Sequence, residues 1–150
     1  MSAIDKIDAR ILRELELNGR ISNAELANRV GLSASACLRR VQELERSNTI
    51  KGYRAILNQT QLGIGCVAYV TVGLSSHTKN AQLEFEGAIT LSEEVKECHN
   101  ITGPFEYLLR VETTDLISYK KFHTDVLGTS AHVASITTHV VMGSPKDDRA

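Results

Sequence analysis

The residue types that most often carry catalysis or bind metals are few in this chain and poorly placed for either role. Cys98 and His99 are neighbours, but adjacent residues of a strand point to opposite faces, so they cannot easily pair as nucleophile and base. The histidines, at positions 77, 99, 123, 132 and 139, show neither the HxH nor the HExxH spacing of a metal site. No carboxylate pair with a shared task and no phosphate-binding loop is present. The pattern predicts no catalytic site, no metal site and no cofactor.

Arginines on one face of a predicted helix give the clearest chemical signal. The helix covers residues 33–46, and at about 100° per residue an apolar arc lies opposite a polar, basic arc. The apolar arc contains Cys37, Leu38, Val41 and Leu44, and the basic arc contains Ser35, Ala36, Arg39, Arg40, Glu43 and Arg46. Small residues come first, so the helix start can approach the floor of a DNA groove. The arginines follow, within reach of guanine edges or phosphates. An ordinary amphipathic surface helix is the alternative.

A short helix and a tight turn are predicted to position this basic helix. Ser22 is a predicted N-cap, and Glu25 three residues later completes a capping box. Gly31 ends the short helix at a position that favours positive φ, and Ser33 starts the next helix. Two helices joined around a glycine form a helix-turn-helix, whose second helix enters the major groove. An amphipathic helix over residues 5–17 supplies the third wall of the core.

Two further segments are predicted between the helices and the second half of the chain. Residues 50–57 are expected to form a short β-hairpin or wing with Gly52 at its bend. Lys51 and Arg54 would be available there for phosphates. Residues 58–65 are polar, carry two glycines, and are expected to be a linker. The predicted domains are therefore 1–61 and 62–150.

The second half predicts an α+β domain. Strands are expected at residues 66–74, 95–102, 107–113 and 133–142, with helices at 79–91 and 115–126. The order βαββαβ is typical of a ferredoxin-like sandwich, in which two helices cover one face of an antiparallel sheet. The other face, expected to carry Tyr69 and Leu109, needs a cover, and the sheet of a second subunit is the simplest one.

Charge and composition favour a DNA-binding front half in a reducing compartment. The formal net charge of −1 combines +3 over residues 1–60 with −4 over residues 61–150. Cysteines at positions 37, 66 and 98 suggest neither a disulfide framework nor a zinc site, which indicates the cytoplasm. No apolar run approaches the roughly 20 residues of a membrane span, and the N-terminus carries no apolar core of a signal peptide.

Several motifs in order resemble the Lrp/AsnC (feast/famine) family of transcriptional regulators. They are IDARILRELELNGRISNAELANRVGLSASACLRRVQELE, the segment IKGYRAILN, the stretch ECHNITGPFEYLLRV, and VVM near the end. The resemblance covers nearly the whole chain. It implies an N-terminal winged helix-turn-helix domain followed by a ferredoxin-like effector domain. The positions that match DNA-facing residues of the family are Ser22, Asn23, Ser33, Ser35, Ala36, Arg39 and Arg40.

The same resemblance implies an amino-acid effector. In the family, effectors commonly bind where dimers meet, and dimers usually assemble into octamers. The matching positions are His99, Asn100, Ile101, Thr102, Gly103, Pro104, Phe105, Glu106, Tyr107, Leu116, His139, Val140 and Val141. Glu106 departs from the family's Gly-x-x-Asp-Tyr turn, so the identity of the effector is open. From the residues alone, the Gly103-Pro104 pair is a plain turn, and His99 and His139 are equally well explained as surface residues.

Two functions are consistent with these observations. The first is a regulator that binds pseudo-palindromic DNA as a dimer, assembles further on the nucleoid, and responds to a small amino acid. The second is an architectural protein that wraps DNA with little sequence preference and no effector. A third candidate, an enzyme on the ferredoxin-like domain, lacks any converging set of catalytic residues.

Overall fold

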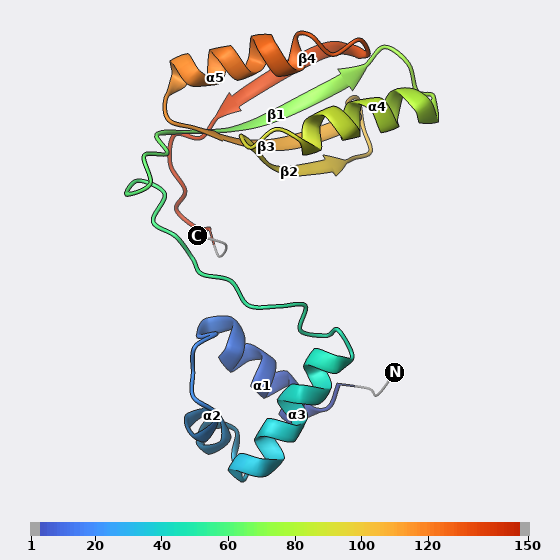
Figure 1. Cartoon of the computed structure of the whole chain (residues 1–150). Coiled ribbons are helices and arrows are strands. Elements are labelled where there is room, and N and C mark those ends of the chain that lie inside the picture. Colours follow the sequence, from blue (N-terminus) through green and yellow to red (C-terminus); the bar gives the residue numbers. More distant parts are fainter. Residues whose placement is uncertain (1–3, 148–150) are drawn as a thin grey trace. The chain divides into compact units, whose positions relative to one another are not determined.

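The computed structural model describes residues 4–147 and divides them into two compact units (Figure 1). One unit ends at Ala55 and the other begins at Ile56, a few residues before the predicted boundary. The predicted linker is bonded to the second unit. The Gln59 side-chain amide donates to a Glu112 carboxylate oxygen over 2.7 Å, and the Gly65 N–H donates to the Thr113 carbonyl over 3.1 Å.

Three helices form the first unit, as predicted: α1 (Lys6–Leu17), α2 (Asn23–Val30) and α3 (Ala34–Arg46). Their apolar stripes meet in one core, since each helix is too short to be stable without such packing. The buried residues of this core are Ile11, Leu26, Ala27, Val30, Cys37 and Leu44. No described helix has the length and apolar content that a bilayer crossing requires.

The helix ends follow the predicted caps with one exception. Ser22 Oγ accepts the Glu25 N–H over 3.2 Å, and Gly31 takes the left-handed conformation with φ of 76°. The reciprocal half of the predicted capping box is missing, because the Glu25 carboxylate pairs with Arg29 over 2.5 Å instead. A two-sided capping box forms at the start of α1, where Asp5 is the N-cap residue. The helix-turn-helix geometry is therefore set locally by caps and glycine.

The predicted wing is wrong in this structure. Ile50 packs against the helical core, but residues 51–57 contain no strand and are exposed throughout. The Tyr53 hydroxyl donates to the Glu45 carboxylate over 2.9 Å and holds the segment to the end of α3. A two-stranded ribbon without a covered apolar face is marginal in water. Here Ile56 and Leu57 are exposed, and no part of residues 4–147 covers them.

The second unit has the predicted βαββαβ order. Its elements are β1 (Cys66–Leu74), α4 (Lys79–Thr90), β2 (Val95–Asn100), β3 (Tyr107–Thr113), α5 (Leu116–Phe122), the π-helical turn η1 (His123–Leu127) and β4 (Val133–Val140). The sheet is antiparallel with strand order β2-β3-β1-β4. The helices α4 and α5 cover one face of it (Figure 1). This arrangement confirms the ferredoxin-like α+β fold.

The two faces of the sheet differ, and one prediction about them is wrong. Leu109 was expected on the open face but is 0 % exposed, in the core beneath the helices with Val70, its partner across the strands. Tyr69 lies on the other face as predicted, opposite Arg110 in the register. Since side chains alternate along a strand, the register that buries Val70 must also bury Leu109. The open face is more polar than expected and includes the ion pair of Arg110 and Glu112.

Candidate DNA-binding surface and effector site

The first turn of α3 presents small side chains, as the sequence predicts. Ser33 Oγ accepts the Ala36 N–H over 3.2 Å and lies 3.3 Å from Ser35 Oγ. Ser33 and Ser35 are exposed and Ala36 is half-buried. The cap satisfies a free N–H group of the helix end, and the turn stays slim enough to approach a groove.

Two of the predicted DNA-facing residues hold the helix-turn-helix together. The Asn23 side-chain amide donates to the Ala34 carbonyl over 2.8 Å, which joins the start of α2 to the start of α3. Ser22 caps α2 through its hydroxyl. Their side chains fix the angle between the helices, so their first role is to orient α3.

Arg39 and Arg40 differ in their surroundings. Arg39 is exposed and forms no ion pair with any described residue. Arg40 was expected beside it on the DNA-facing arc, but its Nη1 donates to Asp5 over 2.7 Å and to Asp8 over 2.8 Å. Its side chain is 30 % exposed. Arg40 therefore ties α3 to the start of α1 and is not free to read bases in this conformation.

The acidic partners of Arg40 also cap α1. Asp5 accepts the backbone N–H groups of Ile7 and Asp8, each over 2.8 Å. The N–H of Asp8, followed by the guanidinium of Arg40, holds the pKa of Asp5 below its usual value. A carboxylate at a helix N-terminus is also favoured by the helix dipole. These long-range contacts explain why Arg40 turns inward.

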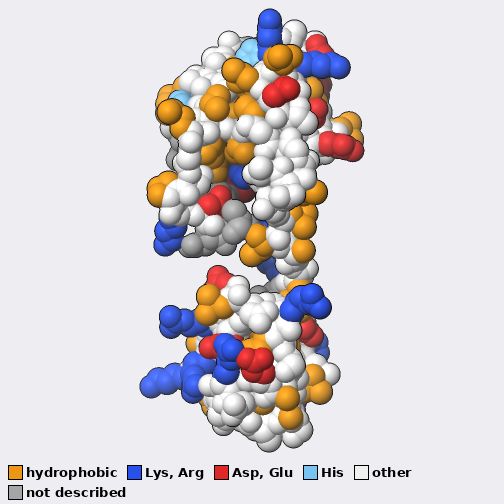
Figure 2. Space-filling model, turned by 90° about the vertical axis from the view of Figure 1, so that its left-hand side faces the viewer, with side chains coloured by type: hydrophobic (Ala, Val, Ile, Leu, Met, Phe, Trp, Pro, Cys, Tyr) orange, Lys and Arg blue, Asp and Glu red, His pale blue; other side chains and the backbone are white. Residues whose placement is uncertain are grey.

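The remaining predicted cations are only partly available. Arg46 pairs with Glu43 over 2.7 and 2.9 Å, and this guanidinium lowers the pKa of Glu43. Lys51 and Arg54 lie on the exposed segment that follows α3. Figure 2 shows Lys and Arg side chains next to acidic ones on the N-terminal unit, at the bottom of the view. Leu38, predicted on the apolar arc, is exposed, because α1 and α2 cover the side of α3 that carries Cys37 and Leu44.

The predicted effector residues fall into two groups at opposite ends of the sheet. The first group surrounds the turn between β2 and β3 and contains His99, Asn100, Ile101, Thr102, Gly103, Pro104, Phe105, Glu106 and Tyr107. The second group contains Leu116, His139, Val140 and Val141. In the register Tyr107 lies beside Val72, whereas Val140 lies beside Ala68, at the end where β3 leads into α5. Val72 and Ala68 are four residues apart along β1, about 13 Å, and β2 and β4 lie at opposite edges of the sheet, so one chain holds the two groups apart.

The turn of the first group is closed by backbone bonds and a glycine. The Ile101 N–H donates to the Glu106 carbonyl over 2.9 Å. Gly103 has φ of 114°, which side chains other than hydrogen rarely tolerate. Thr102, Gly103 and Pro104 are exposed at its tip. The tip is free to meet a ligand or another subunit.

Glu106 joins this turn to the end of β1. Its Oε2 accepts the Leu74 N–H over 2.8 Å, and its Oε1 lies 3.0 Å from His77 Nδ1. The pairing of β1 with β3 ends at Val72, two residues earlier, so the Leu74 N–H, which points to the same side as Val72, has no strand partner. Glu106 thus replaces a missing ladder bond. No sequence pattern indicated His77, because its contact depends on how the loop after β1 folds.

Tyr107 was expected at the effector site but lies in the core. It is 1 % exposed, its ring centroid is 4.7 Å from that of Phe85, and its hydroxyl donates to Glu86 over 2.6 Å. Burial, followed by the hydrogen bond to Glu86, raises the pKa of Tyr107 to about 12. Alternation along β3 directs Tyr107 toward the helices and Glu106 away from them.

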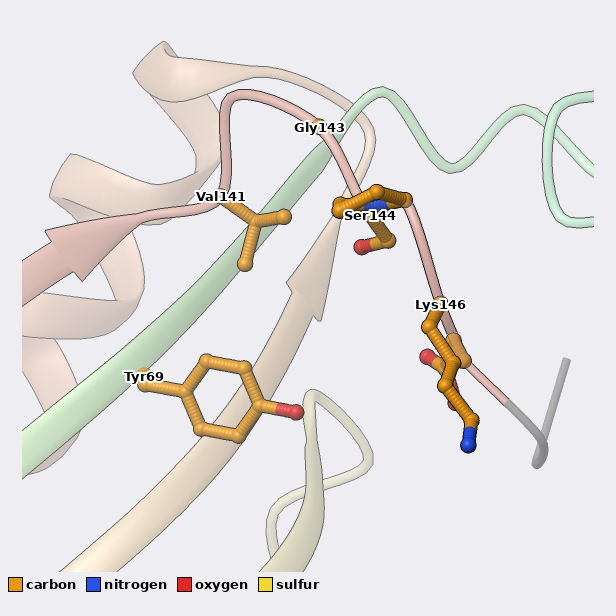
Figure 3. Close-up of a pocket in the computed structure, with 7 residues that line it drawn as sticks. Tyr69, Val141, Gly143, Ser144 and Lys146 are labelled. Carbon is orange, nitrogen blue, oxygen red and sulfur yellow. The ribbon is translucent and has the colours of Figure 1, made fainter.

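Part of the second group borders a cavity. A cavity of about 660 Å³ lies between the open face of the sheet and the segment after β4. It is lined by Tyr69, Val141, Gly143, Ser144, Pro145, Lys146 and Asp147. Figure 3 shows the Tyr69 hydroxyl pointing toward the segment that carries Ser144 and Lys146. Leu116 lies exposed at the start of α5.

The predicted separation of Cys98 and His99 is confirmed. Cys98 packs against the core, where burial raises the pKa of its thiol. His99 is exposed and its Nε2 lies 3.2 Å from a Glu97 carboxylate oxygen. Within residues 4–147, no group of three or more His, Cys, Asp or Glu side chains is arranged to hold a metal ion.

Comparison with known proteins agrees with both units. An AsnC-type helix-turn-helix domain matches residues 4–45, and an Lrp/AsnC ligand binding domain matches residues 67–150. The leucine-responsive regulatory proteins of Salmonella typhimurium and of Escherichia coli K12 are each 40 % identical over 143 residues. Each match covers 95 % of this chain and 87 % of the relative.

Solved structures agree over the whole chain. A transcriptional regulator from Neisseria meningitidis, solved with L-methionine, has a TM-score of 0.93 and 33 % identity, and the match covers 97 % of this chain and 94 % of that one. A feast or famine regulatory protein from M. tuberculosis, complexed with L-methionine, has a TM-score of 0.85 and 29 % identity, with 99 % and 98 % covered. The two domain matches follow each other along the chain, and the relatives match it over nearly its full length. The chain therefore belongs to the Lrp/AsnC family of transcriptional regulators.

Proposed function

We propose that this protein is a sequence-specific transcriptional regulator whose assembly or DNA binding responds to a small amino acid. The main support for this proposal is a complete helix-turn-helix in which the first turn of α3 is accessible and Arg39 follows it on the exposed side. Residues 1–61 would supply DNA binding and the linker, and residues 62–150 effector binding and assembly. No catalytic step is proposed, because the relatives are regulators.

For DNA recognition, the start of α3 would enter the major groove. Ser35 and Ala36 would approach base edges, and Arg39 would reach guanine or phosphate. Lys51 and Arg54 would add phosphate contacts that carry no sequence information. Arg40 would act as a positioning residue through Asp5 and Asp8. Two such units on a symmetric dimer would match a pseudo-palindromic operator. The protein would act in the cytoplasm, on the nucleoid.

For effector binding, the separation of the two groups supports a site between subunits. The turn around Gly103 of one copy would meet the Leu116 and His139–Val141 end of another. The open sheet face, which includes Tyr69, would be covered by a second copy, and the resulting dimers would build an octamer. A ligand that binds between subunits can shift assembly when it prefers one arrangement over another.

The test combines DNA selection with an effector panel. A random duplex pool is selected on the full-length protein at fixed salt, sequenced, and the winning duplex is titrated by fluorescence anisotropy against unselected DNA. Each common L-amino acid, leucine and methionine included, is then added at millimolar concentration. We expect an enriched pseudo-palindrome and one amino acid that changes its affinity. A specificity ratio near one, with no amino acid effective, would support the architectural alternative.

A further inference from the structure

The solvent-facing side of α4 differs from an ordinary exposed helix face. The helix packs on the sheet through Ala81, Phe85 and Ile89, which are buried. Leu83, Gly87 and Leu91 lie four residues apart on the opposite side, where Leu83 is 55 % exposed and Leu91 is 85 % exposed. We call these three residues the α4 stripe. A helix side that points away from its own core normally carries polar residues, so the α4 stripe indicates a further contact.

Gly87 in the middle of the α4 stripe has no explanation within the chain. A glycine inside a helix is destabilising relative to alanine. Its φ is not positive, and a Cβ built there would meet nothing within 4 Å. Neither the backbone nor local packing therefore requires glycine. The close approach of another helix would require it.

We propose that the α4 stripe binds the α4 stripe of a second copy, with the two helices crossing antiparallel at Gly87. A two-fold axis through the crossing makes the contact self-complementary. Leu83 of each copy then packs on Leu91 of the other, and the two glycines allow the backbones to come close. Leu91 keeps helical backbone angles as the C-cap residue, so the α4 stripe continues to the end of the helix.

Charge at the ends of α4 favours a second copy in the antiparallel orientation. Lys79 is the first residue of α4, where it faces the positive end of its own helix dipole, and the last turn carries no basic residue. In an antiparallel pair, each Lys79 lies beside the negative end of the other helix. Glu93 and Glu94 follow that end in the chain, and although Lys96 donates to the Glu93 carbonyl over 2.6 Å, two acidic side chains outnumber one basic side chain there. Two identical faces thus complement each other at both ends.

The proposed contact is independent of effector and DNA binding. The α4 stripe lies on the side of the domain that the helices cover, whereas the open sheet face lies on the other side. A dimer through the sheet would leave α4 free. Contacts through α4 would then join such dimers into larger particles.

The first test is disulfide trapping in the full-length protein. Gly87→Cys is compared with Ala88→Cys, which places the thiol on the same helix but about 100° around its axis. A disulfide requires Cα atoms within about 7 Å, which the proposed crossing provides only at position 87. After mild oxidation, we expect a covalent dimer that is several-fold stronger for Gly87→Cys than for Ala88→Cys. The unmodified chain corrects for disulfides through Cys98.

A second test does not depend on the folding of Gly87→Cys. Leu83→Glu is compared with Ala88→Glu by sedimentation velocity. We expect Leu83→Glu to lower the mass of the largest particle at least twofold, whereas Ala88→Glu leaves it unchanged, and both keep their circular dichroism and DNA affinity at low concentration. Equal trapping at positions 87 and 88, or an unchanged particle mass in Leu83→Glu, would overturn the proposal.

Discussion

Adjacent residues on α3 have different tasks because only one of them finds a partner within the fold. Arg39 points into solvent, whereas Arg40 bonds to two carboxylates at the start of α1. A recognition helix needs both a group that contacts DNA and a group that holds the helix at a fixed angle. Substitution of these neighbours therefore separates contact from positioning.

Arg39→Ala is expected to weaken operator binding by about 1–3 kcal/mol without changing thermal stability. Arg40→Ala is expected to lower the thermal midpoint, because Asp5 and Asp8 lose their cation. Anisotropy titrations at fixed salt and thermal unfolding of both variants measure the two effects. If Arg40→Ala loses affinity at unchanged stability, Arg40 contacts DNA directly.

The lowered pKa of Asp5 predicts a specific loss of stability in acid. The charged form is favoured in the folded state, so its contribution is present above the ordinary pKa of 3.8 and is lost as the pH falls through the lower, folded value. Asp5→Asn keeps an N-cap side chain but cannot titrate. Between about pH 4 and about pH 2, the wild type should lose more stability than Asp5→Asn in urea unfolding. Parallel losses would show that Asp5 is not responsible.

At the scale of elements, the features that depend on residues within one segment could be predicted from the sequence. The features that depend on contacts between segments could not. The helices, the order of strands and helices along the chain and the caps at Ser22 and Ser33 depend on nearby residues and were predictable. The inward turn of Arg40 depends on carboxylates more than thirty positions away in the chain, and no local period reports it. The core position of Tyr107 depends on the register of β3, since one residue of shift exchanges the faces of a strand. The wing does not form, because a two-stranded ribbon needs its apolar face covered and no part of residues 4–147 covers residues 51–57.

The bridge from Glu106 to β1 predicts how two substitutions differ. Glu106→Ala leaves the Leu74 N–H without an acceptor beside a nearly buried residue, which should cost about 1–3 kcal/mol. Glu106→Gln keeps an oxygen acceptor and should lose less. Urea unfolding measures both, and the amino-acid panel applied to Glu106→Gln shows whether the effector needs the carboxylate. Equal stability of all three proteins would show that the hydrogen bond from the Leu74 N–H to Glu106 does not stabilise the fold.

At the scale of the whole molecule, the proposed effector site would combine two copies of the chain. Because the two groups are separated along the sheet, each proposed site would be assembled from a turn of one subunit and a sheet end of another. Variants in the two groups should therefore complement each other when their subunits are mixed.

The Gly103→Thr protein and the Leu116→Glu protein, each measured alone, should show no effector response. After co-refolding at equal amounts, about a quarter of the sites combine an intact turn with an intact sheet end, and part of the effector-induced stabilisation should return. Calorimetric titration of the mixture measures the recovered sites. No recovery in particles that demonstrably contain both variants would place each site within a single subunit.

Pairing between arginines and carboxylates on the N-terminal unit has a consequence for how ionic strength controls this regulator. Arg29, Arg40 and Arg46 already carry carboxylate partners from their own chain. A neutralised guanidinium displaces few condensed counterions from DNA, so only unpaired cations such as Arg39 and Lys51 contribute fully to the salt slope of binding. Affinity should then decline less steeply with added salt than the number of arginines suggests. Base contacts would carry a larger share of the binding free energy as ionic strength rises.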